Sequence, residues 1–350
     1  MAARVCRSAD LRGVSTTAFD LRPIDLLDPA QQAAGEAFMG VHAAAQRHLF
    51  GDRGSAWSLV EVQEIHRRGD RRRVDRAVWR DGQVVGALEV MMPLHDNLRH
   101  AMIWLSVEPG HRGSGVGTAL LAEAERIAAA EGRTILVSET EWAEGRRDEA
   151  ESFATRHGYT IAQTVLRSEQ AVGECRERLE PLVRSSSGDY VVESFVDDMP
   201  EEWLVDRAVL QQRMSTDAPA DDLDTEEEAW TPERLRELQA WARASGRRVV
   251  ESAARHVRNG RLVGFSTIGV SAPPPGLGYQ QDTLVLEEHR GHGLGRRLKA
   301  ANALTLMEAL PEVGTVRTWN SATNEHMLAV NRELGYVVDG YSRTWQKVVR

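Results

Sequence analysis

The sequence predicts an α/β fold made of two tandem copies of one domain, each a mixed sheet flanked by helices. A glycine-rich motif occurs twice, and each occurrence follows a strand-like segment and precedes a helix-like one. The chain has 350 residues, which at roughly 150 residues per domain also favours two domains.

The two copies are related by a nearly constant offset. His111–Gly117 (HRGSGVG) matches His289–Gly295 (HRGHGLG), 178 residues later. At the same offset Asp81–Gly86 matches Asn259–Gly264, Val107 matches Val285 and Leu120 matches Leu298, and Gly158-Tyr159 matches Gly335-Tyr336 at 177. These matches, in the same order at a nearly constant offset, indicate a duplicated domain.

A linker is expected between the copies. Pro181 and the run Ser185–Gly188 are typical of a connection, so we predict a linker at 171–189. The first copy then spans 18–170 and the second 190–350. Residues 1–17 show no periodicity and are predicted to be a disordered tail.

Each copy is predicted to hold the same elements in the same order. A helical region comes first, then a hairpin whose turn, Asp81-Gly82 or Asn259-Gly260, suits a two-residue type I′ turn. A strand, the glycine loop, a helix, a short strand, a helix and a final strand follow. In the first copy the predicted bounds are 29–50 for the helical region, 84–91 and 102–107 for the strands before the loop, 118–131 for the helix after it and 134–137 for the short strand. In the second copy the same elements are predicted at 201–214 with 232–244, 262–270 and 283–286, 296–309, and 315–319. A strand–loop–helix–strand order is a βαβ unit, and with the hairpin it predicts a mixed sheet.

Composition sets limits on the function. Hydrophobic residues make up 42% and charged residues 27% of the chain, as in globular domains. No apolar run reaches the roughly 18 residues of a membrane span, no secretory signal is visible, and Cys6 and Cys175 have neither redox nor ligand spacing. We therefore expect a cytoplasmic chain without disulfides, membrane association or a metal. The net charge of −9 argues against a nucleic-acid partner and is compatible with a cationic substrate.

The glycine loop has the properties of a phosphate site. Alternate glycines let a ligand approach the main-chain N–H groups, and the following helix points its positive end at the loop. The adjacent arginine adds charge-assisted hydrogen bonds. The dinucleotide fingerprint is absent because Leu120 and Leu298 occupy the third glycine position, and the Lys-Ser/Thr pair of a P-loop is absent too.

The segment Val107–Gly117 resembles the acetyl-CoA signature of the GCN5-related N-acetyltransferase (GNAT) family, in which a strand valine and a proline precede Arg-Gly-x-Gly-x-Gly. The second copy is similar but carries Glu287 in place of the proline. The two copies together cover about 330 residues and are similar to tandem members of this family. The resemblance implies two tandem acyl-CoA N-acyltransferase domains. It assigns to the acetyl-CoA site Val107, Arg112, Gly113, Ser114, Gly115, Val116, Gly117 and Thr118 in the first copy, and Val285, Leu286, Arg290, Gly291, His292, Gly293, Leu294, Gly295, Arg296 and Asn324 in the second.

The resemblance also implies a reaction. A primary amine attacks the thioester of acetyl-CoA directly, a base removes the amine proton, and a tyrosine commonly protonates the leaving thiolate. In the second copy Asn324 and Asn331 keep the family spacing, but Asn331 occupies the tyrosine position and is able only to donate a hydrogen bond. The first copy has Arg147 and Ala154 at these positions. We therefore expect chemistry in the second copy.

The base is the least determined residue. Asp282, three residues before Val285, is our candidate, and Trp104 is its counterpart in the first copy. Glu89 is the weaker alternative. Trp319 is predicted to be a core residue. The acidic stretch 217–228 is predicted to be a solvated loop; alternatively, it lies over the cleft of the second copy and attracts a cationic amine.

The expected function is N-acetylation of a primary amine on a small molecule. A peptide or protein amine is an alternative acceptor, and a non-catalytic acetyl-CoA-binding sensor or scaffold is the alternative class, which the missing tyrosines keep open. An internal pseudo-dimer predicts a monomer. Acceptor pockets are built from variable loops, so the acceptor is not readable from the sequence.

Overall fold

The computed structural model describes residues 20–184, 188–217, 219–271 and 277–349. The predicted tail at 1–17 lies outside this part of the chain, as do residues 185–187 of the predicted linker. The rest of that segment contains the helix α5 (Arg176–Arg184), which packs against α8 (Leu294–Ala309). The connection between the copies is therefore largely helical.

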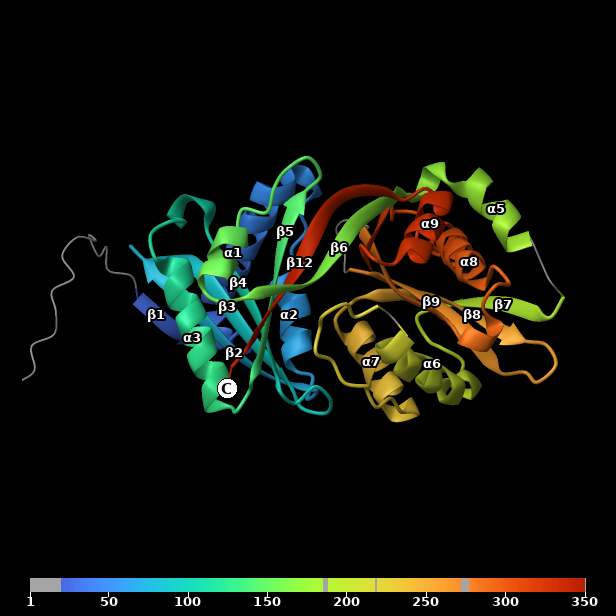
Figure 1. The fold of residues 1–350 in the computed structure, drawn as a ribbon, viewed down its shortest axis with the longest axis horizontal. Coiled ribbons are helices and arrows are strands. Elements are labelled where there is room, and N and C mark those ends of the chain that lie inside the picture. The colour runs from blue at the N-terminus through green and yellow to red at the C-terminus, as the bar shows by residue number, and fades with distance from the viewer. Residues whose placement is uncertain (1–19, 185–187, 218, 272–276, 350) are drawn as a thin grey trace, which may run out of the picture.

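One twisted sheet of twelve strands runs through the described residues, from β1 at one end to β7 at the other (Figure 1). Its order is β1-β2-β3-β4-β5-β12-β6-β11-β10-β9-β8-β7. The strands are β1 (Asp20–Ile24), β2 (Arg71–Arg80), β3 (Gln83–Pro93), β4 (His100–Val107), β5 (Ile135–Ala143), β6 (Thr160–Ala171), β7 (Tyr190–Val196), β8 (Arg248–His256), β9 (Leu262–Val270), β10 (Leu277–Val285), β11 (Thr315–Ser321) and β12 (Val337–Val348). Parallel and antiparallel pairs both occur, so the predicted mixed α/β sheet is confirmed.

The two copies exchange their final strands. β12, from the end of the second copy, pairs with β5 of the first, while β6, from the end of the first copy, pairs with β11 of the second. β6 and β12 also pair with each other at the centre of the molecule, where Figure 1 shows them running side by side. Each copy is thus completed by a strand of the other, and neither sequence repeat is a separate structural unit.

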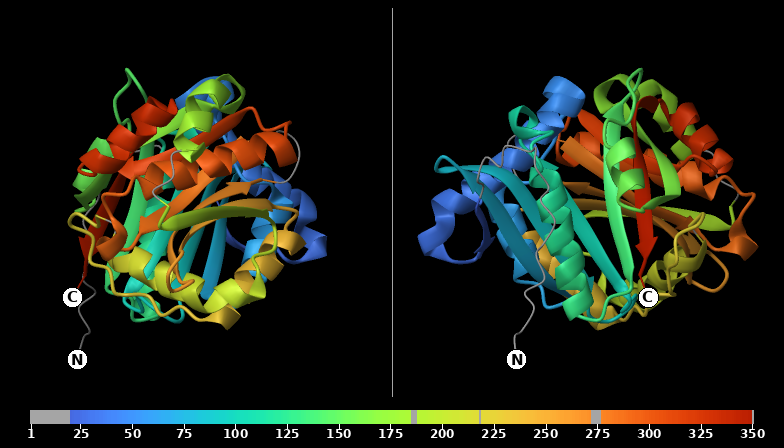
Figure 2. Two further views of the ribbon diagram at one scale, coloured as in Figure 1. Left: turned by 90° about the vertical axis from the view of Figure 1, so that its right-hand side faces the viewer. Right: turned by 60° about the vertical axis from the view of Figure 1, so that its left-hand side comes forward.

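Helices cover both faces of the sheet (Figure 2). In the first copy α3 (Val116–Ala130) buries Leu120, Ala124 and Ile127 on one face, and α1 (Gln32–Phe50) buries Phe38 and Val41 on the other. In the second copy α8 takes the place of α3. The remaining helices are α2 (Leu59–His66), α4 (Glu151–Arg156), α6 (Leu204–Asp217), α7 (Pro232–Ala244) and α9 (Glu325–Leu334). No helix in the described ranges has both the length and the apolar character that crossing a bilayer requires.

The two predicted hairpin turns differ. Asp81 and Gly82 have φ of 50° and 77°, as a type I′ turn requires. At the second turn only Gly260 has positive φ, 70°, so the two-residue prediction is wrong there. The Asn259 side chain instead accepts the N–H of Arg261 at 3.1 Å, and the N–H of Gly260 bonds to the carbonyl of His256 at 2.9 Å, which closes a longer loop.

In each copy the two central parallel strands separate toward their carboxyl ends. β4 pairs with β5 only from His100 to Ile103, although β4 continues to Val107. β10 pairs with β11 only from Leu277 to Tyr279, although it continues to Val285. A wedge therefore opens between the strands directly before each glycine loop, the place where α/β sheets bind ligands.

Candidate functional site

The two glycine loops have the same backbone geometry. Gly113 and Gly115 have φ of 73° and 89°, and Gly291 and Gly293 have φ of 81° and 67°, in the left-handed region that favours glycine. A Cβ atom at Gly113, Gly115 or Gly291 would meet nothing within 4 Å, so the backbone conformation and not packing requires glycine there. Helices α3 and α8 begin directly after Gly115 and Gly293, so unpaired N–H groups at both helix starts face the loop.

The loop arginines are also placed alike. Arg112 Nε donates to the carbonyl of Val107 at 3.4 Å, and Arg290 Nε donates to the carbonyl of Val285 at 3.1 Å. Each guanidinium then reaches one carboxylate, Glu149 at 3.0 Å or Asp217 at 2.8 Å. Both arginine side chains remain partly exposed to solvent, so an incoming phosphate has access to each guanidinium.

The neighbouring residues of both loops have ordinary structural contacts. Val116 and Leu294 are buried first residues of their helices, and Ser114 Oγ donates to the carbonyl of His111 at 2.6 Å. In the second copy Arg296 pairs with Glu333 at 3.1 Å, and the ring of His292 lies 5.3 Å from that of Tyr190. Leu286 directly follows β10, and Gly295 and Thr118 lie in the first turns of their helices.

A large cavity begins at the loop of the first copy. It measures about 1240 Å³ and extends from Arg112–Thr118 across the wedge between β4 and β5. Its walls include α1, the start of α4, and residues of β10 and β11 from the second copy. We call it the larger cavity. Gly117 and Thr118 line it, and no residue of the second copy's glycine loop does.

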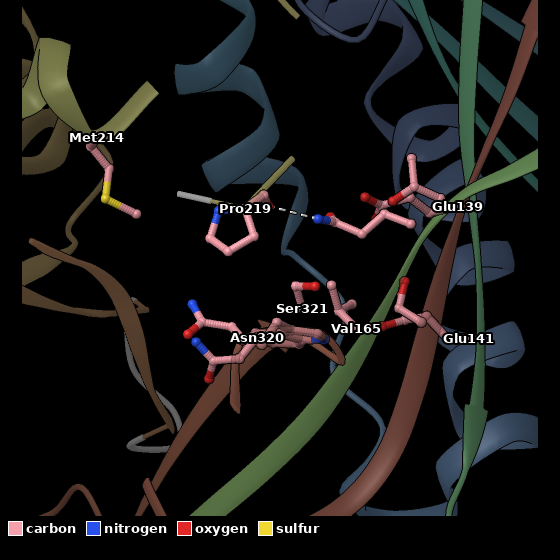
Figure 3. Close-up of a pocket in the computed structure, with 12 residues that line it drawn as sticks. Glu139, Glu141, Val165, Met214, Pro219, Asn320 and Ser321 are labelled. Atoms are coloured by element: carbon pink, nitrogen blue, oxygen red, sulfur yellow. Dashed lines mark hydrogen bonds between the residues drawn. The ribbon is translucent and has the colours of Figure 1, made fainter. Parts of the chain in front are cut away.

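A smaller cavity of about 440 Å³ lies where the copies meet. Figure 3 shows Glu139 and Glu141 on one wall and Met214 on the opposite side, with Asn320 and Ser321 between them. Glu139, Glu141 and Trp319 line both cavities, so the two spaces meet at these side chains. Trp319 is a wall residue and only partly buried, so the prediction that it belongs to the core is wrong.

The predicted catalytic residues of the second copy lie outside both cavities. Asp282 sits at an irregularity of β10 and accepts a hydrogen bond from Gln211 Nε2 at 2.8 Å. Asn331 is 2% exposed, and its Nδ2 donates to Asn320 Oδ1 at 2.6 Å. Asn324 lines the smaller cavity, but its Oδ1 caps α9 by accepting the N–H of Met327 at 3.1 Å.

The described part of the acidic stretch 217–228 contributes Pro219 to the lining of the smaller cavity, and most of its carboxylates have partners. Asp221 accepts hydrogen bonds from Ser321 at 2.9 Å and Thr323 at 2.7 Å. Asp224 pairs with Arg99 at 3.4 Å, and the side chain of Glu226 accepts the N–H of Asn97 at 3.1 Å. The stretch thus ties the second copy to the β3–β4 connection of the first, and these bonds reduce its capacity to attract a free amine.

Glu139 is the side chain with the most suitable chemistry for a base. It is accessible from the cavities but surrounded by protein; this desolvation, together with the charge of Glu141, raises its pKa to about 7. Glu141 accepts a hydrogen bond from Gln46 at 2.5 Å, whereas no hydrogen-bond partner of Glu139 is found among the described residues. Sequence reasoning missed both because the predicted strand ends at residue 137, whereas β5 continues to Ala143 with both carboxylates on one face.

A second polar group in the larger cavity is held neutral. His42 Nδ1 lies 2.9 Å from Ser106 Oγ, and burial lowers the pKa of His42 to about 4. A histidine with this pKa carries no charge at neutral pH. It therefore leaves the carboxylates as the main charged groups on this side of the cavity.

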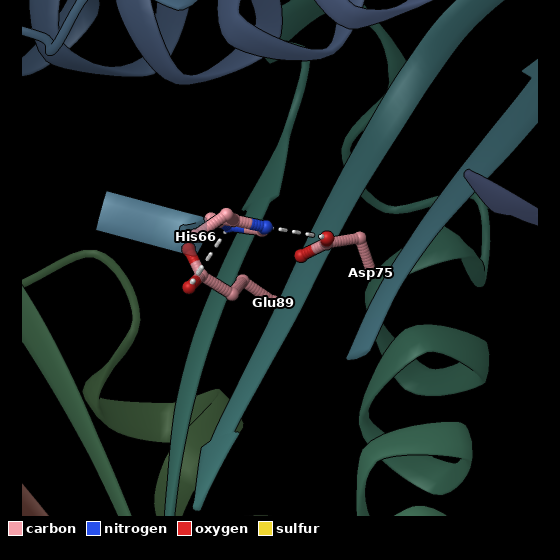
Figure 4. Close-up of side chains that lie close together, drawn as sticks. All are labelled: His66, Asp75 and Glu89. Carbon is pink, nitrogen blue, oxygen red and sulfur yellow. Dashed lines mark ion pairs between the residues drawn. The ribbon is translucent and has the colours of Figure 1, made fainter. Parts of the chain in front are cut away.

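His66, Asp75 and Glu89 form a buried cluster (Figure 4), and Glu89 also lines the larger cavity. His66 Nδ1 lies 3.5 Å from Asp75 and its Nε2 lies 3.6 Å from Glu89. Burial raises the pKa of Asp75 to about 7. Burial also acts to raise the pKa of Glu89, but the neighbouring His66 and Arg73 hold it below its usual value. One ligand atom from each residue lies within 4.8 Å of the others, yet Arg73 Nη1 is 2.6 Å from Glu89 and already supplies a cation. We interpret the cluster as an ion-pair network.

Comparison with known proteins agrees with this geometry. The model of a family described as the acetyltransferase (GNAT) family matches residues 36–159 and 216–336, more than half of the chain. A mycothiol acetyltransferase of Tsukamurella paurometabola is 26% identical over 234 residues, covering 66% of this chain and 72% of the relative. One from Rhodococcus jostii is 27% identical over 241 residues, covering 67% and 71%.

Solved structures share the tandem fold. A tandem GNAT protein from the clavulanic acid biosynthesis pathway superimposes with a TM-score of 0.79 at 24% identity, covering 95% of this chain and 98% of that one. A GCN5-related N-acetyltransferase from Sphaerobacter thermophilus gives a TM-score of 0.68 at 18% identity, covering 97% and 98%. Two such domains in one chain are thus an arrangement that also occurs in a solved structure.

Proposed function

The chain belongs to the acetyltransferase (GNAT) family, and we propose that it transfers the acetyl group of acetyl-CoA to a primary amine of a small molecule in the larger cavity. Acetyl-CoA is the family's acyl donor. The pyrophosphate would be held by Arg112 and the N–H groups of residues 113–118, and the thioester would lie in the wedge between β4 and β5.

The larger cavity carries this proposal. It is the space that joins a glycine loop to a carboxylate with a suitable pKa. Its volume of about 1240 Å³ leaves room for an acceptor beside the donor. Sequence reasoning favoured the second copy because it keeps Asn324 and Asn331, but Asp282 and Asn331 are bonded within the protein and line neither cavity. These contacts favour structural roles for both.

Glu139 is the proposed base. The amine enters as an ammonium ion and gives a proton to Glu139, and its nitrogen then bonds to the thioester carbonyl carbon. The C–S bond breaks, the amine loses its second proton as the amide forms, and CoA leaves as a thiolate that takes up a proton. A base with a pKa near 7 is half ionised at neutral pH and returns its proton readily, which suits this role.

The test is to follow release of the CoA thiol with a panel of amines and to identify the N-acetylated product by mass spectrometry. We expect thiol and product in equal amounts, and a loss of about 100-fold in kcat for Glu139→Gln. Glu177→Gln, an exposed change on α5, serves as the control. Binding of acetyl-CoA with no product from any amine would instead support a sensor or scaffold and contradict the proposal.

A further inference from the structure

The junction of the two cavities combines two features that recognise one kind of molecule. Two carboxylates, Glu139 and Glu141, point from β5 into the space where the cavities meet. Two pairs of aromatic side chains line the larger cavity, one pair from each copy: Trp57 with Trp104, and Tyr279 with Trp319. The first copy supplies both carboxylates and one pair of aromatic side chains, and the second copy supplies the other pair.

Of the cationic side chains that line the larger cavity, Arg167 acts electrostatically on Glu141. Among the described residues neither Glu139 nor Glu141 forms an ion pair. Arg167 is already engaged in an ion pair, since it lies 2.9 Å from Asp339. Two carboxylates on one face of a strand repel each other, and a cation between them removes that cost.

The aromatic side chains form two pairs. Trp57 and Trp104 meet edge to face with ring centroids 6.2 Å apart, and Tyr279 and Trp319 stack at 6.1 Å with an interplanar angle of 13°. Trp104 is 36% exposed, which is unusual for so large an apolar side chain and marks it as a contact surface. Such rings bind flat apolar groups, and their faces also attract cations.

We propose that the acceptor is a cationic amine attached to a flat ring, and that it binds across the junction of the two copies. This inference rests on the proposed function and assigns its acceptor. The ammonium lies between Glu139 and Glu141, with Glu139 as the base and Glu141 as the fixed charge, and the ring lies among the aromatic side chains. An amine that also carries a carboxylate is repelled by the two glutamates.

Calorimetry with CoA present tests the acceptor site without turnover. The probes are tyramine, its neutral analogue tyrosol, its carboxylate-bearing analogue tyrosine, and n-propylamine, which lacks the ring. We expect tyramine to bind about tenfold more tightly than each of the other three. Equal binding of tyrosol or tyrosine would overturn the role of the carboxylates, and equal binding of n-propylamine would overturn the role of the rings.

Two variants separate the contributions. Glu141→Gln is expected to weaken tyramine about tenfold and to leave tyrosol unchanged, whereas Trp319→Leu is expected to weaken both. An unchanged Kd for acetyl-CoA shows that each variant is folded. Thiol release is measured in parallel. Turnover of amines with no preference for tyramine would overturn this inference and leave the proposed function intact. Binding of tyramine without turnover of any amine would overturn the proposed function and uphold the acceptor site.

Discussion

Glu139 of the first copy and Trp319 of the second line the same two cavities, although 180 positions separate them in the chain. The exchange of β6 and β12 places their strands in one sheet, with only the two exchanged strands between β5 and β11. His100 and Gly278 are equivalent positions of the two copies, and their partners in the sheet are Ile135 and Val316. Four residues further along each strand lie Glu139 and Asn320, so Asn320, next to Trp319, is the counterpart of Glu139. The duplicated strand therefore carries a carboxylate in one copy and an amide in the other.

The rate is expected to depend on the ionisation of Glu139. Its raised pKa, about 7, means that below pH 7 the carboxyl holds its proton and is unable to accept one from the amine. We expect kcat/KM to fall about tenfold per pH unit below 7 and Glu139→Gln to remove this dependence. Glu141→Gln removes one of the two causes of the raised pKa, so the fall should move to lower pH. An unchanged profile in both variants would assign the base elsewhere.

A buried ion pair joins the exchanged strands and should be important for stability. Arg167 on β6 lies 2.9 Å from Asp339 on β12, and the two are 1% and 4% exposed. Arg167→Met leaves a buried carboxylate without this partner, which is expected to cost about 3–5 kcal/mol. Arg243→Met, which breaks an exposed pair with Asp198, should cost under about 1 kcal/mol. Urea unfolding measures both, and equal losses would contradict this role of the pair.

The sequence predicts most elements of the fold, because glycine placement and hydrophobic spacing are local signals. Pro232–Ala244 and Leu262–Val270 match the predicted bounds. The strand exchange has no local signal. β12 would follow α9 whether it paired within its own copy or with the first copy, and only its contacts with β5 decide between the two. The cavity walls that Glu139 and Trp319 share depend on that exchange, so the two residues could not be associated from their positions in the sequence.

The buried polar groups show the same limit. His66, Asp75 and Glu89 come from α2, β2 and β3, with no spacing that marks a cluster. The glycine loops, by contrast, were readable because all their parts are consecutive in the chain. Which glycine loop opens into the larger cavity depends on elements that are distant in the chain, such as α1 and the start of α4.

Lys299 should make stability depend on pH. Burial in α8 lowers its pKa to about 7, so between pH 7 and its unfolded value near 10.5 the unfolded chain binds more protons. Its contribution to stability therefore rises with pH across this window, by about 1.4 kcal/mol per pKa unit, and below pH 7 the folded protein bears the full cost of a buried charge. Lys299→Met should stabilise the protein at pH 7 and lose that advantage near pH 10, in urea unfolding at both values. A constant difference would contradict the assignment.

Chelation should not affect the enzyme. Arg73 occupies the position at Glu89 where a metal ion would add positive charge, so a metal at His66 and Asp75 would have to displace it. We expect dialysis against EDTA to leave both turnover and the thermal unfolding temperature unchanged. Loss of either, restored by Zn²⁺ and prevented by His66→Ala, would contradict the ion-pair interpretation.

The central claim is that acetyl transfer uses the glycine loop of the first copy, and a matched pair of variants tests it most directly. Gly117 and Gly295 occupy the same position of α3 and α8, and neither requires glycine for its φ. A Cβ atom would make ordinary contact with Phe153 at 3.6 Å in the first case and meet nothing within 4 Å in the second. Aspartate suits the first turn of a helix, but its charge repels a pyrophosphate.

Thiol release is therefore to be measured for Gly117→Asp and Gly295→Asp under the same conditions. The account predicts that Gly117→Asp lowers kcat/KM for acetyl-CoA by about 100-fold or more and that Gly295→Asp changes it less than about twofold. The reverse result would contradict the claim and return the chemistry to the second copy, with Asp282 as its base.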